Sequence, residues 1–262
     1  KKNIIYHYDL GNDFYKLWLD KTMTYSSALF KSEKEDLSKA QENKYQQLID
    51  QLKIESHHKI LEIGCGWGGF AEYAAKNIGC EIKGITISPS QLEFAKSRIK
   101  NQGLDNKVTF ELCDYRDLKG KFDRVVSIEM IEAVGEKYWI DYFKKIKEVL
   151  SKGGMAGIQV ILINNKSYER YSKSVDFIQR YVFPGGMLPS QEKLNENYKK
   201  SGLKEIQSSS FGKSYAKTLG IWHEDFINSI KSIRDLGFDS KLERIFRYYF
   251  SYCRAGFNSE KI

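Results

Sequence analysis

The chain has 262 residues, 41% of them hydrophobic and 14% aromatic, so it can bury a core and is not a disordered segment. Its longest unbroken apolar run, Val160 to Ile163, is far shorter than the ~20 residues of a membrane-spanning helix. With 42 basic and 34 acidic side chains the net charge is +8, which favours an acidic substrate or an anionic membrane surface; no nucleic-acid-binding motif is present.

The first half of the chain changes from a helical pattern to alternating strands and helices. Residues 1–55 are predicted to be helical, because Leu10, Phe14, Leu17 and Trp18 repeat at helical spacing. From His58 onward, strands are expected at Lys59–Ile63, Glu81–Ile87, Val108–Leu112, Phe122–Ile128 and Ala156–Ile163. Helices are expected at Gly69–Lys76, from Ser88 to about Lys100, and at Tyr138–Leu150. Ser88 is predicted to cap its helix, with Pro89 at the first position and Gln91 completing a capping box.

The second half is predicted to add helices to this core. Lys166–Lys200 forms a helical, turn-rich insertion before a further strand near Leu203–Ser209, and Lys217 to Phe257 is helical and aromatic. Strands alternating with helices predict an α/β fold with a mostly parallel sheet, helices on both faces and right-handed crossovers. We expect one domain in four segments: an N-terminal helical segment (1–55), a Rossmann-like core (56–164), a helical cap (165–202), and a C-terminal strand with helices (203–262).

Lysines and cysteines give weaker information. Part of the basic excess lies along the expected helices, where we expect a solvated surface: Lys34, Lys39, Lys44 and Lys53. The chain also has four widely separated cysteines without a CxxC pair: Cys65, Cys80, Cys113 and Cys253. That spacing predicts neither a zinc site nor a disulfide framework, and it fits a reducing cytoplasm.

Residues 61–70, Leu-Glu-Ile-Gly-Cys-Gly-Trp-Gly-Gly-Phe, form a glycine loop between an expected strand and helix. Gly64 and Gly66 permit a tight turn and close approach of a ligand, and the helix N-terminus favours an anionic group. The spacing also fits the dinucleotide motif GxGxxG. However, Glu62 places a carboxylate inside the strand, and the acidic ribose ligand expected about 20 residues later is missing. The pattern from Glu62 to Gly68 is instead typical of methyltransferases that use S-adenosylmethionine (AdoMet).

Further blocks along the chain match one family of these enzymes. They are residues 6–15, 23–28, 84–88, 114–117, 127–132, 181–190, 211–215 and 252–257. With them, the chain resembles the cyclopropane-fatty-acyl-phospholipid synthase and mycolic acid cyclopropane synthase family of class I methyltransferases over nearly all of its length. The proline–glycine block and the tyrosine block at 211–215 favour this lipid branch over the related plant alkaloid N-methyltransferases.

The resemblance implies a reaction at a carbon–carbon double bond. AdoMet donates a methyl group to the cis double bond of an unsaturated phospholipid acyl chain, and the resulting carbocation loses a proton and closes to a cyclopropane ring. Other members of the family stop at a methylated or methylene-bearing chain. This chemistry needs a dry apolar tunnel and one weak base near the cation. In characterised members, that base is a bound bicarbonate ion.

The resemblance assigns the bicarbonate site of this chain to five residues. Glu132 and Tyr215 match family residues, and Ile161 matches the backbone contributor. Ser27 stands where many members have Cys, and Gln159 stands where many have His. Both can still hydrogen-bond a carbonate oxygen, although Gln cannot become cationic. Glu132 is expected to orient the base, while Tyr215 and Gln159 hold it in place.

The resemblance also assigns contacts to AdoMet. Tyr25 and Ser26 resemble contacts to its methionine end, Tyr115 and Arg116 resemble those flanking adenine, and Gln91 is either a contact or only a capping residue. His7 belongs to the N-terminal block that closes over the cofactor. The expected AdoMet-binding residues are Tyr25, Ser26, Glu62, Gly64, Gly66, Gly68, Thr86, Ile87, Gln91, Tyr115 and Arg116. No metal is expected.

Two other functions stay open. A small-molecule N-methyltransferase would need a Glu–His pair near the ends of the fourth and fifth strands, and residues 159–164 supply no such His. A non-catalytic lipid- or AdoMet-binding module would follow if Ser27 and Gln159 disable the base. The leading prediction is a cytoplasmic methyltransferase, peripheral to the inner membrane surface. Its expected partners are phospholipid acyl chains and a second copy of the chain in a homodimer.

Overall fold

A parallel β-sheet forms the centre of the fold. The computed structural model describes residues 10–262. Within them, the strands are β1 (Lys59–Ile63), β2 (Glu81–Thr86), β3 (Val108–Leu112), β4 (Phe122–Ile128) and β5 (Leu150–Gln159). All neighbouring pairs are parallel, in the order β3-β2-β1-β4-β5. The order reverses between β1 and β4, so the crevice where such sheets bind ligands opens beyond the carboxyl ends of these strands. The predicted α/β fold is confirmed.

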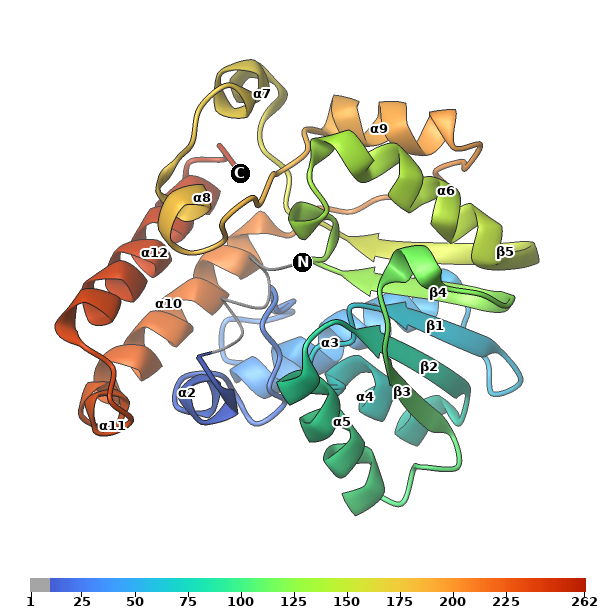
Figure 1. Ribbon diagram of the computed structural model, residues 1–262, viewed down its shortest axis with the longest axis horizontal. Coiled ribbons are helices and arrows are strands. Elements are labelled where there is room, and N and C mark those ends of the chain that lie inside the picture. The colour runs from blue at the N-terminus through green and yellow to red at the C-terminus, as the bar shows by residue number, and fades with distance from the viewer. Residues whose placement is uncertain (1–9) are drawn as a thin grey trace.

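Helices cover both faces of the sheet (Figure 1). On one face lie α3 (Leu37–Leu52), α4 (Gly69–Ile78) and α5 (Pro89–Asn101); on the other lies α6 (Trp139–Val149), with α9 (Gln191–Lys200) beside it. Successive strand residues point to opposite faces. In β1, Ile60 packs with the first set of helices, whereas Leu61 packs with α6. The central strand β1 is therefore buried on both sides after its first residue.

A second group of helices lies beyond the carboxyl ends of the strands (Figure 1). It consists of α2 (Asn12–Lys16), α7 (Asn165–Ser172), α8 (Phe177–Tyr181), α10 (Gly212–Asn228), α11 (Ile230–Asp235) and α12 (Ser240–Asn258). Three single-turn 3-10 helices, Tyr115–Asp117, Ile131–Ala133 and Glu136–Tyr138, follow β3 and β4. Within residues 10–262, no helix combines the length and apolar character needed to cross a membrane.

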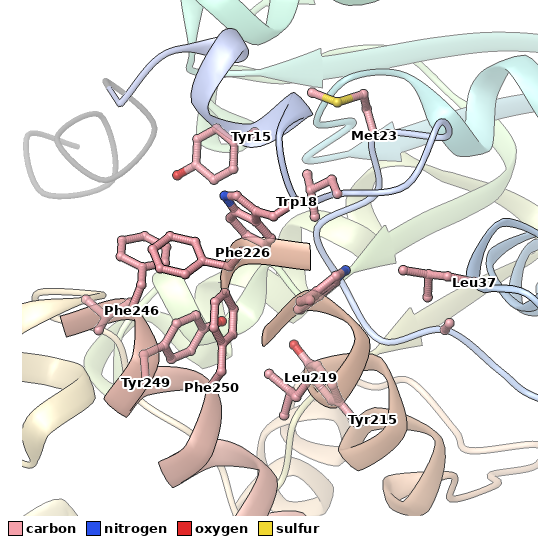
Figure 2. Packing of buried hydrophobic residues seen from close by; sticks show 14 of the residues in the cluster. Tyr15, Trp18, Met23, Leu37, Tyr215, Leu219, Phe226, Phe246, Tyr249 and Phe250 are labelled. Carbon is pink, nitrogen blue, oxygen red and sulfur yellow. The ribbon is translucent and has the colours of Figure 1, made fainter. Parts of the chain in front are cut away.

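Aromatic side chains from both ends of the chain hold this second group together. Trp18 is 1% exposed, and its ring centroid lies 5.8 Å from that of Trp222 and 5.3 Å from that of Phe250. Figure 2 shows Trp18 beside Phe226, Phe246 and Phe250 of α10 and α12. Each edge-to-face pair contributes about 0.5–1.5 kcal/mol beyond its burial. These contacts fix the N-terminal segment over the carboxyl edge of the sheet.

The predicted strand at Leu203–Ser209 is wrong, because the segment has no regular structure. Its only strongly apolar residues are Leu203 and Ile206, and Ile206 is 73% exposed, so the segment has no face to bury. The N-terminal prediction is right only in part, since residues 17–36 between α2 and α3 form turns and irregular structure.

The fifth strand is also displaced from its predicted bounds. β5 begins at Leu150, where the sequence predicts the end of a helix, and a register shift opposite β4 accommodates the early start. Gly153 in this stretch has a φ of 79°, a conformation that glycine adopts without strain. The strand ends at Gln159, and beyond it Ile163 forms only an isolated parallel bridge with Ser190.

Candidate active site

A cavity of about 290 Å³ lies at the carboxyl ends of the strands. Its walls include residues 62–67 of the glycine loop, 85–88 after β2, 113–116 after β3 and 128–130 after β4, together with 23–26 of the N-terminal segment. We call it the first cavity. It occupies the switch point of the sheet, where α/β folds bind their ligands.

The glycine loop lets a ligand approach the backbone of the first cavity. Gly64, Gly66 and Gly68 have φ values of 81°, 52° and 83°, which glycine adopts at no steric cost. A Cβ atom at Gly66 would meet no atom of the described residues within 4 Å, so this position faces open space. At Gly68 a Cβ atom would lie 2.9 Å from the Phe110 ring. Gly66 therefore leaves room for a ligand, whereas Gly68 keeps the loop packed against β3.

Glu62 and Lys44 are buried charged side chains near the first cavity, 3% and 1% exposed. Glu62 lines the cavity, and its Oε2 atom has no hydrogen-bond partner within the described part of the chain. Burial raises the pKa of Glu62 to about 8, although Lys44 opposes that rise. A buried carboxyl oxygen of this kind fits a cationic group, such as the amino group of AdoMet.

The expectation that Lys44 lies on the solvated surface is wrong, because this side chain is buried. Its Nζ atom donates to Ser26 Oγ at 2.7 Å and to Gln41 Oε1 at 2.6 Å. Burial lowers the pKa of Lys44 to about 7, while the carboxylates of Glu129, Asp20 and Glu62 oppose this. Lys44 therefore connects α3 to Ser26 in the wall of the first cavity, and its charge favours the ionised forms of Glu62 and Glu129.

Nearly all of the predicted AdoMet-binding residues come together around the first cavity. Those that line it are Tyr25, Ser26, Glu62, Gly64, Gly66, Thr86, Ile87, Gln91, Tyr115 and Arg116. Gly68 does not line it, because its α-carbon faces Phe110 instead. His7 lies outside the described residues. The role of these residues toward AdoMet stays a prediction.

The predicted capping box at the start of α5 forms only in part. Ser88 Oγ accepts a hydrogen bond from Gln91 N at 3.4 Å, as an N-cap does. The Gln91 side chain does not reach back to Ser88 N. Its Oε1 atom accepts from the Thr86 hydroxyl at 2.9 Å, and Ser88 N donates to Thr86 Oγ1 at 3.2 Å. The Gln91 carboxamide is thereby fixed against the wall of the first cavity.

A second cavity, of about 480 Å³, extends among the helices beyond the sheet. Its aliphatic and aromatic lining includes Ile161, Ile163, Tyr171, Ile178, Phe183, Met187, Leu188, Leu219, Tyr249, Phe257 and Ile262. This size and lining fit an apolar ligand. Tyr25, Glu129 and Ala133 line both cavities, so the two meet at these residues.

Three donors converge on the Glu129 carboxylate where the cavities meet. Its Oε1 atom accepts from Ser27 N and from Gln159 Nε2, both at 2.8 Å, and its Oε2 atom accepts from the Tyr215 hydroxyl at 2.7 Å. Glu129 directly follows β4 and has a φ of 48°, a left-handed conformation uncommon for residues other than glycine. Strained backbone of this kind clusters at functional sites.

Glu132 lines the second cavity and is bonded differently. Its Oε1 atom accepts from Ile161 N at 2.6 Å, and its buried Oε2 atom has no partner among residues 10–262. Burial and the nearby Glu129 raise the pKa of Glu132 to about 8. Burial also raises the pKa of Glu129, but Lys44 and the three donors favour its ionised form. Of the two carboxyls, Glu129 therefore has the surroundings that favour a negative charge, with three donors, whereas Glu132, with one donor and a raised pKa, favours a proton.

The groups predicted to hold a bicarbonate ion do not fit that anion. Four of the donors are already used within the chain, three by Glu129 and one, Ile161 N, by Glu132. The Ser27 hydroxyl, expected to face the ion, donates to the Ala28 carbonyl oxygen at 3.0 Å. An added anion would also face the charge of Glu129, and like charges repel. The predicted residues thus come together around a carboxylate of the chain itself.

Glu129 and Lys44 are the site residues that the sequence analysis missed. Glu129 and Glu132 both follow the fourth strand within the block 127–132, so a second carboxylate at the carboxyl edge was visible. The left-handed backbone at Glu129 decides which of these two carboxylates accepts the three hydrogen bonds. No pattern in the local sequence predicts that backbone conformation. Lys44 carried no signal, because its helix has the mixed polar and apolar pattern of an ordinary surface helix.

The strand order, the cavity at the switch point and the acidic residue before the glycine loop together define the class I methyltransferase fold. Within that class, the chain belongs to the mycolic acid cyclopropane synthetase family, whose model matches residues 1–262.

Curated relatives match this chain over nearly all of its length. Tuberculostearic acid methyltransferase UfaA1 of Mycobacterium tuberculosis is 37% identical, over 99% of this chain and 62% of the relative. Cyclopropane-fatty-acyl-phospholipid synthase of Escherichia coli K12 is 36% identical, over 98% of this chain and 64% of the relative. The chain thus spans less than two thirds of the length of these relatives.

Solved structures have the same fold. Mycolic acid cyclopropane synthase CmaA1, complexed with SAH and CTAB, superposes with a TM-score of 0.93 at 26% identity, over 98% of this chain and 93% of that one. Coclaurine N-methyltransferase superposes with a TM-score of 0.78 at 20% identity, over 95% of this chain and 74% of that one. The second likeness shows the fold alone.

Proposed function

We propose that this chain transfers a methyl group from AdoMet to the cis double bond of an unsaturated phospholipid acyl chain, giving a cyclopropane or a methylated chain. The observation that carries the proposal is the meeting of the two cavities at Tyr25, Glu129 and Ala133. A cavity built by a glycine loop there adjoins a larger and more apolar one. Relatives named for methyl transfer to fatty acids and for cyclopropane synthesis support the same substrate class.

The first cavity is proposed to hold AdoMet, which supplies an electrophilic methyl group. Glu62 would bind its cationic amino group, since the Oε2 atom is otherwise unpartnered among the described residues. Gly66 leaves space for the ligand beside the backbone, and the Thr86–Gln91 hydrogen bond fixes a carboxamide in the wall. Tyr115 and Arg116 line the same cavity after β3 and would flank the adenine.

The second cavity is proposed to hold the acyl chain. Its aliphatic and aromatic walls exclude water from the reacting carbons, which a carbocation requires. The CmaA1 complex supports one site for each ligand, because SAH is what AdoMet becomes after methyl transfer and CTAB carries a long alkyl chain. A bicarbonate ion has no part in this proposal, since the donors expected to bind it are already used.

A row of aromatic side chains is proposed to dock the second cavity on an anionic bilayer. Tyr252 lines the cavity, is 40% exposed and stacks on Tyr248 at 5.7 Å; Tyr248 lies 4.4 Å from Phe177, which lies 5.2 Å from Tyr181. Arg180 lies over the Tyr181 ring. Exposed aromatic rings beside basic residues suit a membrane interface, and the net charge of +8 adds attraction to anionic lipids.

Transfer of labelled methyl groups tests the reaction. The purified chain is incubated with methyl-labelled AdoMet and vesicles of dioleoylphosphatidylglycerol, and the lipids are analysed by mass spectrometry. We expect label in the acyl chains and a gain of one CH₂ unit, with none in vesicles of the saturated distearoyl lipid. Label on added small amines, with none on the unsaturated lipid, would instead establish the N-methyltransferase alternative.

Vesicle sedimentation tests the docking surface. Replacing Tyr181 and Tyr248 by Ser should weaken binding to the anionic vesicles several-fold, because each exposed ring loses its burial at the interface. Ile206→Ser, at an exposed apolar residue in an irregular segment, is the matched control and should bind as the unmodified chain does. Equal binding of the unmodified chain, the double tyrosine variant and Ile206→Ser would show that the aromatic row does not contribute to membrane binding.

A further inference from the structure

Glu129 stands where a base for the proposed reaction has to act. Its carboxylate lines both cavities, so it faces the sites assigned to the methyl donor and to the acyl chain. A carboxylate offers about four lone-pair positions. Ser27 N and Gln159 use two of them on Oε1, and Tyr215 uses one on Oε2. The remaining position, on Oε2, is available to accept a proton.

Hydrogen-bond donors and a lysine surround the Glu129 carboxylate. Lys44 and the three donors favour the ionised form, although burial favours the protonated one. Glu132 is the weaker candidate for a base, because only Ile161 N donates to its carboxyl and because burial and the nearby Glu129 raise its pKa to about 8. Ligands that fill both cavities would displace water from Glu129, and a carboxylate without its water shell accepts a proton more readily than one in solution, which suits a base.

We propose that Glu129 is the general base of this reaction and that no external anion takes part; the inference rests on the function proposed above. The π electrons of the alkene form the bond to the methyl group while the bond from that methyl group to the sulfonium sulfur breaks. Its electron pair stays on sulfur, S-adenosylhomocysteine is the leaving group, and the second alkene carbon is left as a carbocation. Glu129 Oε2 then takes a proton from the transferred methyl group, and the electron pair of that C–H bond closes the ring. Loss of the proton from an adjacent chain carbon would instead form a C=C bond. The proton returns to water when the products leave.

In this mechanism Ser27, Gln159 and Tyr215 are positioning residues. Their hydrogen bonds hold the carboxylate in one orientation at the meeting of the cavities, and they draw on β5, α10 and the N-terminal segment to do so. The bond from Glu129 N to Gln159 O, at 2.9 Å, fixes the backbone as well. Preorganised groups of this kind need no rearrangement at the moment of reaction.

Glu129→Gln is the first test. The amide keeps the shape of the side chain, and its nitrogen can donate to the Tyr215 hydroxyl, but it cannot accept the proton. Methyl transfer to dioleoylphosphatidylglycerol should fall by ~10²-fold or more, the scale of a positioned acid/base group. AdoMet affinity, measured by calorimetry, should stay unchanged. Glu132→Gln, which preserves the acceptor for Ile161 N, should lose much less activity.

Glu129→Gly supplies an independent readout. Glycine suits the left-handed backbone at this position, and its substitution leaves a carboxylate-sized hole beside three free donors. The variant should bind formate or bicarbonate in calorimetry and regain activity when either is added, whereas the unmodified chain should do neither. Lys53→Gly, at an exposed residue with a φ of 49°, controls for the backbone change and should leave activity unaffected.

Two results would overturn the assignment of the base alone. One is turnover of the unmodified chain that stops in bicarbonate-free buffer and returns when bicarbonate is added; the other is Glu129→Gln acting at the unmodified rate. Failure of the proposed function has a different signature, since the unmodified chain would then bind AdoMet and methylate no cis-unsaturated lipid under any buffer. That outcome would remove both proposals together.

Discussion

The two cavities differ in how the chain builds them. The first is made by short consecutive segments at the ends of neighbouring strands, above all residues 62–67 and 85–88, and includes the glycine loop. The second is made by segments that are far apart along the chain, from Tyr25 to Ile262, and many of the residues that line it are aliphatic or aromatic. Backbone positions in a sheet are set by hydrogen bonding, whereas packed apolar side chains tolerate changes of shape at constant volume.

This difference separates what each cavity can select. The first cavity can recognise one ligand by backbone approach and by a few fixed polar groups, so we expect a narrow specificity for AdoMet. The second can hold hydrocarbon chains of differing length, because its contacts are apolar and not directional. Substitutions of residues that line the first cavity alone should therefore alter AdoMet affinity, and those of residues that line the second alone should alter only transfer to lipid.

Gly66→Val should have the largest effect on the first cavity. Side-chain atoms in the volume of the ligand cost about 3 kcal/mol, so AdoMet affinity in calorimetry should fall about 100-fold or more. Gly103→Val is the matched control: Gly103 also has a positive φ, 65°, and an open Cβ position, but it lies in the exposed turn after α5. Equal losses in both variants would attribute the effect to backbone strain and not to the cavity.

Cys253→Trp should block the second cavity and spare the first. Cys253 lines the second cavity from α12, and an indole there would displace the proposed acyl substrate from its reacting position. Lipid methylation should fall by about 10- to 100-fold, the cost of a small misplacement of reacting atoms, with AdoMet affinity unchanged. Ser251→Trp, on the exposed side of the same helix, serves as control. A parallel loss of AdoMet binding would contradict the separation of the two cavities.

Tyr215→Phe should have a smaller effect, at the point where the cavities meet. It removes one hydrogen bond to a charged carboxylate, worth about 1.5 kcal/mol, so turnover should fall by about tenfold. Without that donor the pKa of Glu129 rises, and the acidic limb of the pH–rate profile should shift to higher pH. Tyr198→Phe breaks the same kind of bond, to Glu205 on the surface, and should change neither quantity. An unshifted profile for Tyr215→Phe would place the base elsewhere.

The smallest expected effect is a change of stability with pH, to which one carboxyl from each cavity contributes. Burial raises the pKa values of Glu62 and Glu132 to about 8 in the folded chain, above an ordinary value of 4.5. Between pH 5 and 7 the folded chain holds protons that the unfolded chain releases, so stability falls as pH rises. The Tm of the ligand-free chain should drop by several degrees. Glu132→Gln should reduce the change of Tm with pH, and bound AdoMet should reduce the contribution of Glu62 to that change. A Tm that does not change with pH would mean that both carboxyls are ionised in the folded chain.

The parts of the fold that local patterns determine could be predicted from the sequence. The strands from Lys59 to Ile128 and the glycine loop were located because each depends on neighbouring residues. The second cavity and the Glu129 cluster could not be located, since they join positions 27, 129, 159 and 215. The left-handed backbone conformation of Glu129 then decides which carboxylate accepts the three hydrogen bonds. The strand expected at Leu203–Ser209 shows the reverse error, because its two apolar residues, Leu203 and Ile206, do not lie on one face of a strand and the segment has no regular structure.

The left-handed backbone of Glu129 also bears on how this site can change over generations. Glycine is the residue that such a backbone accepts most readily, and one base change, A to G at the second codon position, converts a glutamate codon to a glycine codon. That single step would exchange a base carried by the chain for a vacancy shaped to capture a small anion from the medium. On this proposal, a single mutation at position 129 would separate an enzyme that needs dissolved bicarbonate from one that does not, with the rest of the active site unchanged.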